Sequence, residues 1–273
     1  MASNLAPEAL EKLGVNFIPL YCKMDGNFPN HHPDPTVSEN LHDLIAMVKK
    51  EKADLGIAFD GDCDRIGAVD EKGNILWGDQ IMVLYSRNIL SQNPGATIIG
   101  EVKCSVNLYD DIKKHGGNGI MWKAGHSLIK SKMKETKALL AGEMSGHIFF
   151  KDKNYGYDDA LYAALRLIEI MSHSEQTLSQ QLSDLPKTYS TPEIRVDSSE
   201  KEKFALVERA REAFKLTHDI IDVDGVRVIF QDGWGLLRAS NTQPIVVLRF
   251  EAFSQESLNE IQKSFKKHLN IEF

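Results

Sequence analysis

The chain has 273 residues, a formal net charge of −7 and 42% hydrophobic residues, so it can bury a sizeable core and divide into two or three domains. It carries no long basic block and no apolar run near the ~18 residues of a membrane span, so we expect neither a nucleic-acid nor a membrane partner. The three cysteines, Cys22, Cys63 and Cys104, lie far apart and outside CxxC spacing. That pattern indicates reduced thiols and predicts a cytoplasmic protein.

Strand-like and helix-like stretches alternate over the first 185 residues, which predicts α/β layers with largely parallel strands. Asp79 is the expected N-cap of one of the helices. The expected elements are a helix at 6–14, a strand at 16–21, a helix at 39–53, a strand at 54–59, a helix at 79–90, strands at 96–102 and 119–124, a helix at 127–138, a strand at 138–143 and a helix at 158–171. Because doubly wound units usually begin with a strand, we expect the first unit to lack its opening strand.

The pattern changes near Pro186, where we place a domain boundary. Beyond it, short strands joined by tight turns predict a small antiparallel α+β domain. Its expected elements are a first strand, a helix at 201–215, strands around 224–230, 233–239 and 244–252, and a final helix.

Three carboxylates are crowded into "FDGDCDR", directly after an apolar strand. Asp60, Asp62 and Asp64 stand at alternate positions, and neighbouring carboxylates oppose one another's ionisation unless a cation offsets the repulsion. Oxygen ligands on one loop suit Mg²⁺. Arg65 follows them, in a position to fix a carboxylate or to contact an anionic ligand. We predict a Mg²⁺ site here; the alternative is a solvated acidic turn.

Two further loops carry polar groups that suit a phosphosugar. "GEMSGH" places Glu143, Ser145 and His147 at alternate positions, a combination suited to a ligand rich in hydroxyls; the alternative is a polar hairpin turn. "RASNTQP" lies between two strands and is dense in donors for a phosphate dianion; the alternative is an ordinary turn. Its candidate phosphate ligands are Arg238, Ser240, Asn241 and Thr242.

In this order, the three loops resemble the metal-binding, sugar-binding and phosphate-binding loops of the α-D-phosphohexomutases, in particular the bacterial phosphomannomutase/phosphoglucomutase branch. Residues 19–35 and 122–135 resemble that branch too, so the resemblance covers nearly the whole chain. It implies two α/β domains with mixed, largely parallel sheets and a C-terminal α+β domain with an antiparallel sheet. These would be a truncated domain II at 1–74, domain III at 75–186 and domain IV at 187–273.

Family members interconvert hexose 1-phosphates and 6-phosphates, here expected to be those of mannose or glucose, through a phosphoserine, Mg²⁺ and a bisphosphate intermediate. The resemblance implies a monomeric isomerase with Mg²⁺ on Asp60, Asp62 and Asp64. It implies catalytic roles for Arg65, Lys103 and His147, with His147 a candidate for proton transfer. The implied substrate ligands are His126, Glu143, Ser145, Arg238, Ser240, Asn241 and Thr242. For Lys103 a solvated strand end is the alternative, and for His126 a helix cap.

Two departures from the family pattern stand out. Cys63 occupies a loop position that is usually glycine, and the family's "TxSHNP"-like serine stretch does not occur in these 273 residues. Ser172 in "MSHSE" lacks the Asn-Pro of that motif and is not expected to be the nucleophile. We therefore expect the C-terminal portion of a phosphohexomutase, inactive alone. The alternative is a non-catalytic protein that binds phosphosugars or Mg²⁺.

Overall fold

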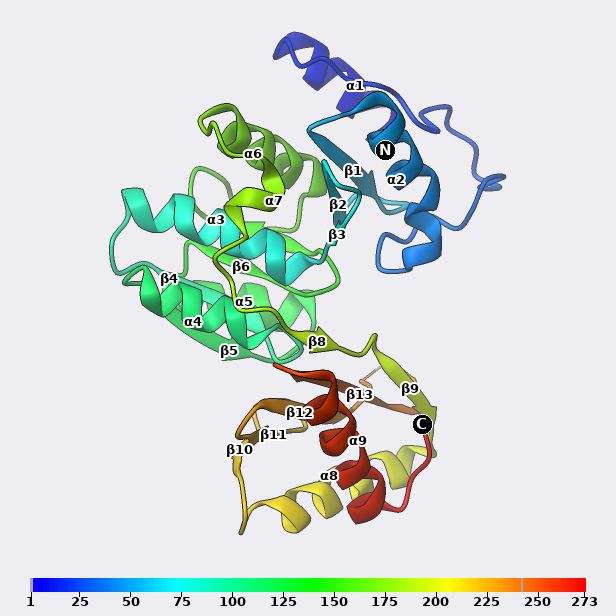
Figure 1. The fold of residues 1–273 in the computed structure, drawn as a ribbon, viewed down its shortest axis with the longest axis vertical. Helices are drawn as coiled ribbons and strands as arrows, with labels where there is room; N and C mark the ends of the chain where they lie inside the picture. Colours follow the sequence, from blue (N-terminus) through cyan, green and yellow to red (C-terminus); the bar gives the residue numbers. More distant parts are fainter. Residues whose placement is uncertain (1, 242) are drawn as a thin grey trace. The chain divides into compact units, whose positions relative to one another are not determined.

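The computed structural model describes residues 2–241 and 243–273, which form two compact units. Of the described residues, the first unit comprises 2–121 and 125–185, and the second comprises 122–124, 186–241 and 243–273. Figure 1 shows that helices accompany the sheets of the first unit and the sheet of the second. None of the described helices combines the length and the apolar character that a membrane-spanning helix needs.

The first unit holds two sheets and most of the helices. Its helices are α1 (Ala2–Lys12), the 3-10 helix η1 (Ser38–Leu41), α2 (His42–Glu51), α3 (Gly78–Gln92), α4 (Val106–Lys114), α5 (His126–Thr136), α6 (Ala160–Ser172) and α7 (Leu178–Gln181). Its strands are β1 (Leu55–Phe59), β2 (Ile66–Asp70), β3 (Ile75–Leu76), β4 (Thr97–Glu101), β5 (Asn118–Trp122), β6 (Leu140–Gly142) and β7 (Ile148–Phe150).

The first sheet has the order β1-β2-β3, and its described pairs are antiparallel. Phe59 pairs with Ile66, so the aspartate loop is the turn of the β1–β2 hairpin. The second sheet has the order β5-β4-β6-β7, with β4 parallel to β6 and β6 antiparallel to β7. The loop at 143–147 joins β6 to β7, so the predicted sugar-binding loop is also a hairpin turn.

One hydrophobic core runs through the first unit. Side chains of β2 and β3 pack in it with those of α3, α6 and the second sheet, among them Ile66, Tyr85, Leu140 and Phe150. The Tyr85 hydroxyl donates to the carbonyl oxygen of Ala163 at 2.7 Å, which ties α3 to α6. This shared core gives the two hairpin loops a rigid support.

The second unit is an antiparallel sheet with the path β10-β11-β12-β13-β8, and β9 also pairs with β13. Its strands are β8 (Tyr189–Ser190), β9 (Ile194–Asp197), β10 (Asp219–Ile221), β11 (Val226–Phe230), β12 (Gly233–Ala239) and β13 (Ile245–Ala252). The helices α8 (Glu200–Phe214) and α9 (Gln255–Leu269) pack against it around Phe214, Phe250 and Phe265. The loop at 240–244 is the turn between β12 and β13.

The fold class is confirmed: a mixed α/β unit is followed by an antiparallel α+β unit. The parallel pairing lies in the second sheet, whereas the described pairs of the first sheet are antiparallel. The strand expected at 16–21 is wrong, because this segment pairs with no strand among the described residues. Asp79 lies inside α3 rather than at its N-cap, which is Trp77; the Asp79 carboxylate instead accepts the backbone N–H of Ser105 at 2.8 Å.

Candidate functional site

The aspartate loop gathers its three carboxylates as the sequence predicts. Asp60, Asp62 and Asp64 each offer an oxygen, and these atoms lie within 4.8 Å of one another. Asp60 is buried, whereas Asp62 is exposed. An all-oxygen set on one hairpin turn fits a hard divalent cation such as Mg²⁺. A second set that could hold a metal ion consists of Asp64, His147 and Asp158, but its imidazole makes it softer.

Two carboxylates of the loop have pKa values shifted in opposite directions: that of Asp60 is lowered and that of Asp64 is raised. Burial opposes ionisation of Asp60, but hydrogen bonds from the backbone and side chain of Arg65 outweigh it and lower the Asp60 pKa. Burial raises the pKa of Asp64, and the negative charges of Asp60 and Asp62 raise it further. The nearby His147 lowers it, but the net result is a pKa of about 6. A bound cation would relieve this crowding.

Arg65 fixes carboxylates rather than standing free. Its Nε lies 2.7 Å from Asp60 Oδ2, and its Nη1 lies 3.2 Å from Asp34 Oδ1. Asp34 is 31 positions earlier in the chain, and no periodicity or motif indicates this pairing. The guanidinium therefore links the loop to the segment that precedes α2.

Cys63 has a left-handed backbone conformation, with φ of 67°. An L side chain adopts this region at a cost that glycine does not have, which explains physically why glycine suits the position. Burial raises the pKa of the Cys63 thiol to about 11, with Asp159 and Asp60 adding to the effect. The thiol is therefore protonated at neutral pH and a poor ligand for soft metals.

Backbone contacts hold the loop at 143–147 against the aspartate hairpin. The Ile66 N–H donates to the Gly146 carbonyl oxygen at 3.0 Å, and the Gly78 N–H donates to the Met144 carbonyl oxygen at 3.1 Å. A Cβ on Gly146 would lie 2.2 Å from the oxygen of Ile66, and a Cβ on Gly78 would lie 2.2 Å from that of Glu143. Both glycines are therefore required for the loop to dock this closely.

Glu143 organises the polar face of this loop. Its side chain is buried, and Oε1 accepts the Gly125 N–H at 2.9 Å while Oε2 accepts the Ser145 hydroxyl at 3.2 Å. Gly125 is the N-cap of α5, so His126 is the first residue of that helix rather than its cap. The rings of His126 and His147 are 6.5 Å apart. The structure thus brings four predicted substrate and catalytic side chains together.

His147 lies between two carboxylates. Its Nδ1 is 3.3 Å from Asp158 Oδ2 and 3.6 Å from Asp64 Oδ1. Burial disfavours the charged ring, but the close contact with the Asp158 carboxylate and the charges of Glu143 and Asp64 outweigh it, so the His147 pKa is raised. The same contact lowers the Asp158 pKa to about 2 against the effect of burial. Asp158 carried no signal for this role in the sequence, where it stands at the start of a predicted helix.

Lys103 is buried rather than solvated, with 8% of its surface exposed. Its Nζ lies 3.5 Å from Oε1 of Glu101, a fully buried carboxylate that also accepts the Met144 N–H at 3.3 Å. Glu101 therefore connects Lys103 to the loop at 143–147. The sequence offered no signal for it beyond its place at the end of a predicted strand.

The predicted phosphate loop lies in the second unit. Arg238 is 8% exposed, and its Nε donates to Asp224 Oδ2 at 2.9 Å, so Asp224 orients the guanidinium. Ser240 is buried and its hydroxyl accepts the Gln243 N–H at 3.2 Å, whereas Asn241 is exposed. The fourth candidate, Thr242, lies outside the described residues.

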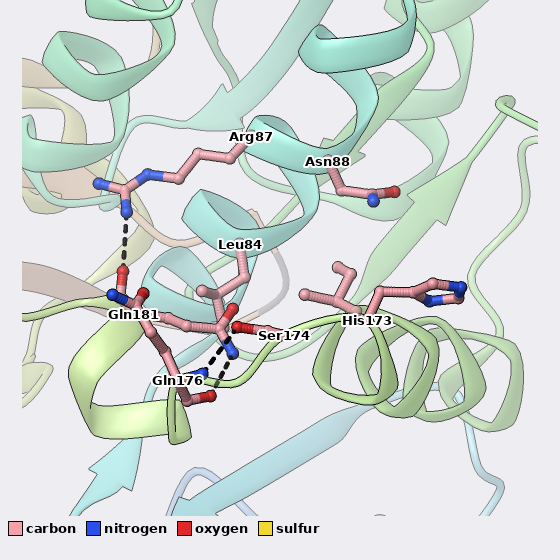
Figure 2. A pocket seen from close by; sticks show the side chains of 8 residues that line it. Leu84, Arg87, Asn88, His173, Ser174, Gln176 and Gln181 are labelled. Carbon is pink, nitrogen blue, oxygen red and sulfur yellow. Dashed lines mark hydrogen bonds between the residues drawn. The ribbon is translucent and has the colours of Figure 1, made fainter.

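Two hollows in the first unit lie apart from most of these side chains. Figure 2 shows a hollow of about 310 Å³ between α3 and the α6–α7 connection, where Arg87 donates to the Gln181 carbonyl oxygen at 2.7 Å. A larger, mainly apolar groove of about 970 Å³ runs along α1, the segment at 15–33, α2, β1 and α6. Among the predicted site residues that the structure describes, only Asp60 lines it. The Ser172 hydroxyl, at the end of α6, donates to the Glu169 carbonyl oxygen at 2.8 Å.

Models of three consecutive domains of one family match almost the whole chain. Phosphoglucomutase/phosphomannomutase alpha/beta/alpha domain II matches residues 1–73, alpha/beta/alpha domain III matches residues 77–189, and the C-terminal domain matches residues 193–268. The chain therefore belongs to the α-D-phosphohexomutase family.

Curated relatives and solved structures agree with this. Over 270 residues the chain is 52% identical to the phosphomannomutase/phosphoglucomutase of Pseudomonas aeruginosa, covering 98% of this chain and 58% of the relative. It is 51% identical to the phosphoglucomutase of Neisseria gonorrhoeae over 93% of this chain and 56% of the relative. A phosphoglucomutase/phosphomannomutase family protein from Burkholderia thailandensis superimposes with a TM-score of 0.92 at 46% identity, over 98% of this chain and 58% of that one. The chain thus spans just over half the length of these relatives.

Proposed function

We propose that this chain supplies the metal-binding, sugar-binding and phosphate-binding parts of a phosphohexomutase, which interconverts hexose 1-phosphates and 6-phosphates of glucose or mannose. The observation that carries the proposal is the docking of the loop at 143–147 against the aspartate hairpin through Ile66 and against the start of α3 through Gly78. That docking brings three carboxylates that suit a hard cation close to the side chains that would bind sugar hydroxyls. The relatives' names supply the substrate class.

Each group has a role that its geometry suits. Asp60, Asp62 and Asp64 would hold Mg²⁺, which when bound offsets negative charge on a phosphoryl group. Arg65 keeps Asp60 ionised, and Lys103 would add positive charge from the neighbouring β4 end. Phosphoryl transfer depends mainly on such positioning and charge neutralisation.

The hydroxyl-binding groups act in a second way. Glu143 and Ser145 would bind sugar hydroxyls, with His126 beside them. His147 would accept a hydroxyl proton at its ring and return it, since Asp158 stabilises the charged ring. The phosphate that is not reacting would lie on Arg238, Ser240, Asn241 and Thr242.

A binding experiment on Arg238 tests the substrate class. Loss of a charged, bidentate contact costs about 1.5–3 kcal/mol, or roughly ten- to hundredfold in affinity. We expect Arg238→Ala to weaken glucose 1-phosphate binding by that factor in calorimetry while leaving glucose binding unchanged. Arg209→Ala, an exposed site on α8 with the same charge change, is the control. Equal weakening for both sugars would mean that the loop does not bind phosphate.

A further inference from the structure

Lys203 is an almost completely buried lysine on α8, 2% exposed, and it has no role in the function proposed above. Its Nζ lies 2.8 Å from the carbonyl oxygen of Ser240, 3.2 Å from that of Gln243 and 2.8 Å from Glu200 Oε1. An ammonium group has three donors, so these three acceptors match its full capacity. Two of the three belong to the loop that joins β12 to β13.

Burial of this ammonium has a cost that an apolar side chain would avoid. Removing a charged amine from water is unfavourable unless it is paired and hydrogen-bonded. Lys203 also stands near the N-terminus of α8, whose N-cap is Ser199, and the helix dipole disfavours a cation at that end. The partner Glu200 is mostly exposed, so its ion pair with Lys203 is screened by water. The contacts that offset the cost are therefore mainly those with the loop.

The two carbonyl groups flank the exposed tip of the loop, where Asn241 lies. Carbonyl oxygens repel a phosphate dianion, and the buried ammonium keeps these two turned toward the interior. The Ser240 N–H donates to the Ile245 carbonyl oxygen at 3.0 Å, which closes the loop onto β13. The Lys203 ammonium thus holds the two carbonyl groups from the buried side of the loop and adds a positive charge there.

We propose that Lys203 is a positioning residue of the phosphate loop: its ammonium holds the Ser240 and Gln243 carbonyl groups away from the bound phosphate. This inference rests on the proposed function, because it assumes that the loop at 238–243 binds the phosphate of the sugar. Lys203 itself does not touch the ligand. It acts through the backbone of the loop.

The test compares Lys203→Met with Lys201→Met in the full 273-residue chain. Both substitutions remove one positive charge from the same helix, but Lys201 is exposed. Calorimetry with glucose 1-phosphate and with glucose measures binding at a temperature where thermal melting shows the variants to be folded. Hydrogen exchange by mass spectrometry measures protection of the amides at 240–245 and, separately, in the rest of α8 and the sheet. Lys203→Arg, which keeps a charged donor, tests rescue.

We expect Lys203→Met to weaken glucose 1-phosphate binding at least tenfold, to leave glucose binding unchanged and to speed exchange at 240–245 only. Lys201→Met should match the wild type, and Lys203→Arg should recover most of the affinity. Unchanged affinity in Lys203→Met, or faster exchange spread evenly over α8 and the sheet, would overturn the inference. If the wild-type chain binds glucose 1-phosphate no better than glucose, the proposed function itself fails, which is a separate outcome.

A measurement on the wild type covers a Lys203→Met variant that does not fold. The side-chain nitrogen signal of Lys203 is followed by NMR during a titration with inorganic phosphate. We expect a saturable shift with the midpoint of phosphate binding, since the loop and the ammonium are hydrogen-bonded. A signal that stays constant at saturating phosphate contradicts the coupling.

Discussion

Asp64 and Asp60 share one loop, yet their surroundings have opposite effects on ionisation. Arg65 stabilises the charge on Asp60, whereas burial and the neighbouring carboxylates raise the pKa of Asp64 to about 6. The sequence predicted the crowding from the alternate spacing. The spacing does not indicate which carboxylate has the raised pKa. That depends on the contacts of Arg65 with Asp60 and of His147 with Asp64, which form only in the folded chain.

The raised Asp64 pKa predicts how Mg²⁺ binding depends on pH. A metal ligand must be ionised, and with a pKa of about 6 Asp64 binds a proton below that pH. Mg²⁺ affinity should therefore be constant near pH 7.5 and fall by up to roughly tenfold per pH unit below pH 6. Calorimetry at several pH values measures this, and below pH 6 the proton that Asp64 releases to the buffer on Mg²⁺ binding should appear as buffer-dependent heat.

One aspartate variant inside the loop and one outside it provide the control for this prediction. Asp62→Ala should abolish the site, while Asp110→Ala, an exposed aspartate on α4, should bind Mg²⁺ as the wild type does. Identical binding by Asp62→Ala and the wild type, or an affinity that is flat from pH 5 to pH 7.5, would show that these carboxylates do not hold the ion.

At the scale of elements, periodicity identified most helices and strands, including α2, α3 and the strands β11 to β13. It failed for residues 16–21, whose apolar character indicated a strand, because a strand also needs a pairing partner. It also did not reveal how the loops dock. The close approach of Gly78 to the loop at 143–147 depends on backbone contacts between residues more than sixty positions apart.

A substitution at Gly78 tests that docking. An alanine Cβ there would lie 2.2 Å from the Glu143 carbonyl oxygen and 2.9 Å from the Gly146 nitrogen, so backbone atoms would have to move. We expect Gly78→Ala to reduce the free energy of unfolding by about 1–3 kcal/mol, as overpacking does. Gly26→Ala, where the new Cβ meets nothing within 4 Å, should be close to neutral. Urea unfolding measures both, and equal stability of the two variants would contradict close docking.

At the scale of the whole molecule, each unit has its own hydrophobic core. The sequence located the change near residue 186 from the shift in pattern, and the two units divide at 185–186. The further division of the first unit at residue 74 stays a prediction, because β2 and β3 share a core with α3 and α6. The sequence pattern thus predicts the fold class, but it does not predict which elements pack into one hydrophobic core.

Separate cores predict separate unfolding. Phe265 is fully buried and its ring lies 4.9 Å from that of Phe214 and 5.1 Å from that of Phe250. Phe265→Ala should cost about 3–5 kcal/mol and lower only the calorimetric transition of the second unit. Mg²⁺ should raise only the other transition. Phe204→Ala, at a site 57% exposed, is the control. A single transition that shifts as a whole in Phe265→Ala would contradict independent cores.

Catalysis requires a group that accepts a phosphoryl group and returns it, and none of the roles proposed for the three loops is that one. The Ser145 hydroxyl donates to Glu143, and the Ser240 hydroxyl accepts the Gln243 N–H within the loop at 240–243. Neither serine has the "TxSHNP"-like neighbours that the resemblance associates with the nucleophile. The chain should therefore hold its ligands without turning them over. Ligand binding without turnover is therefore the expected result when both are measured on one sample.

The direct measurement is a mutase assay on the purified 273-residue chain, with glucose 1-phosphate, Mg²⁺ and glucose 1,6-bisphosphate, alongside calorimetry on the same sample. We predict saturable binding of glucose 1-phosphate that is roughly ten- to hundredfold weaker in Arg238→Ala, together with no formation of glucose 6-phosphate above the rate without protein. Robust turnover by this chain would contradict that prediction and make Ser145 the first residue to substitute. Absence of any glucose 1-phosphate binding would contradict the proposed function itself.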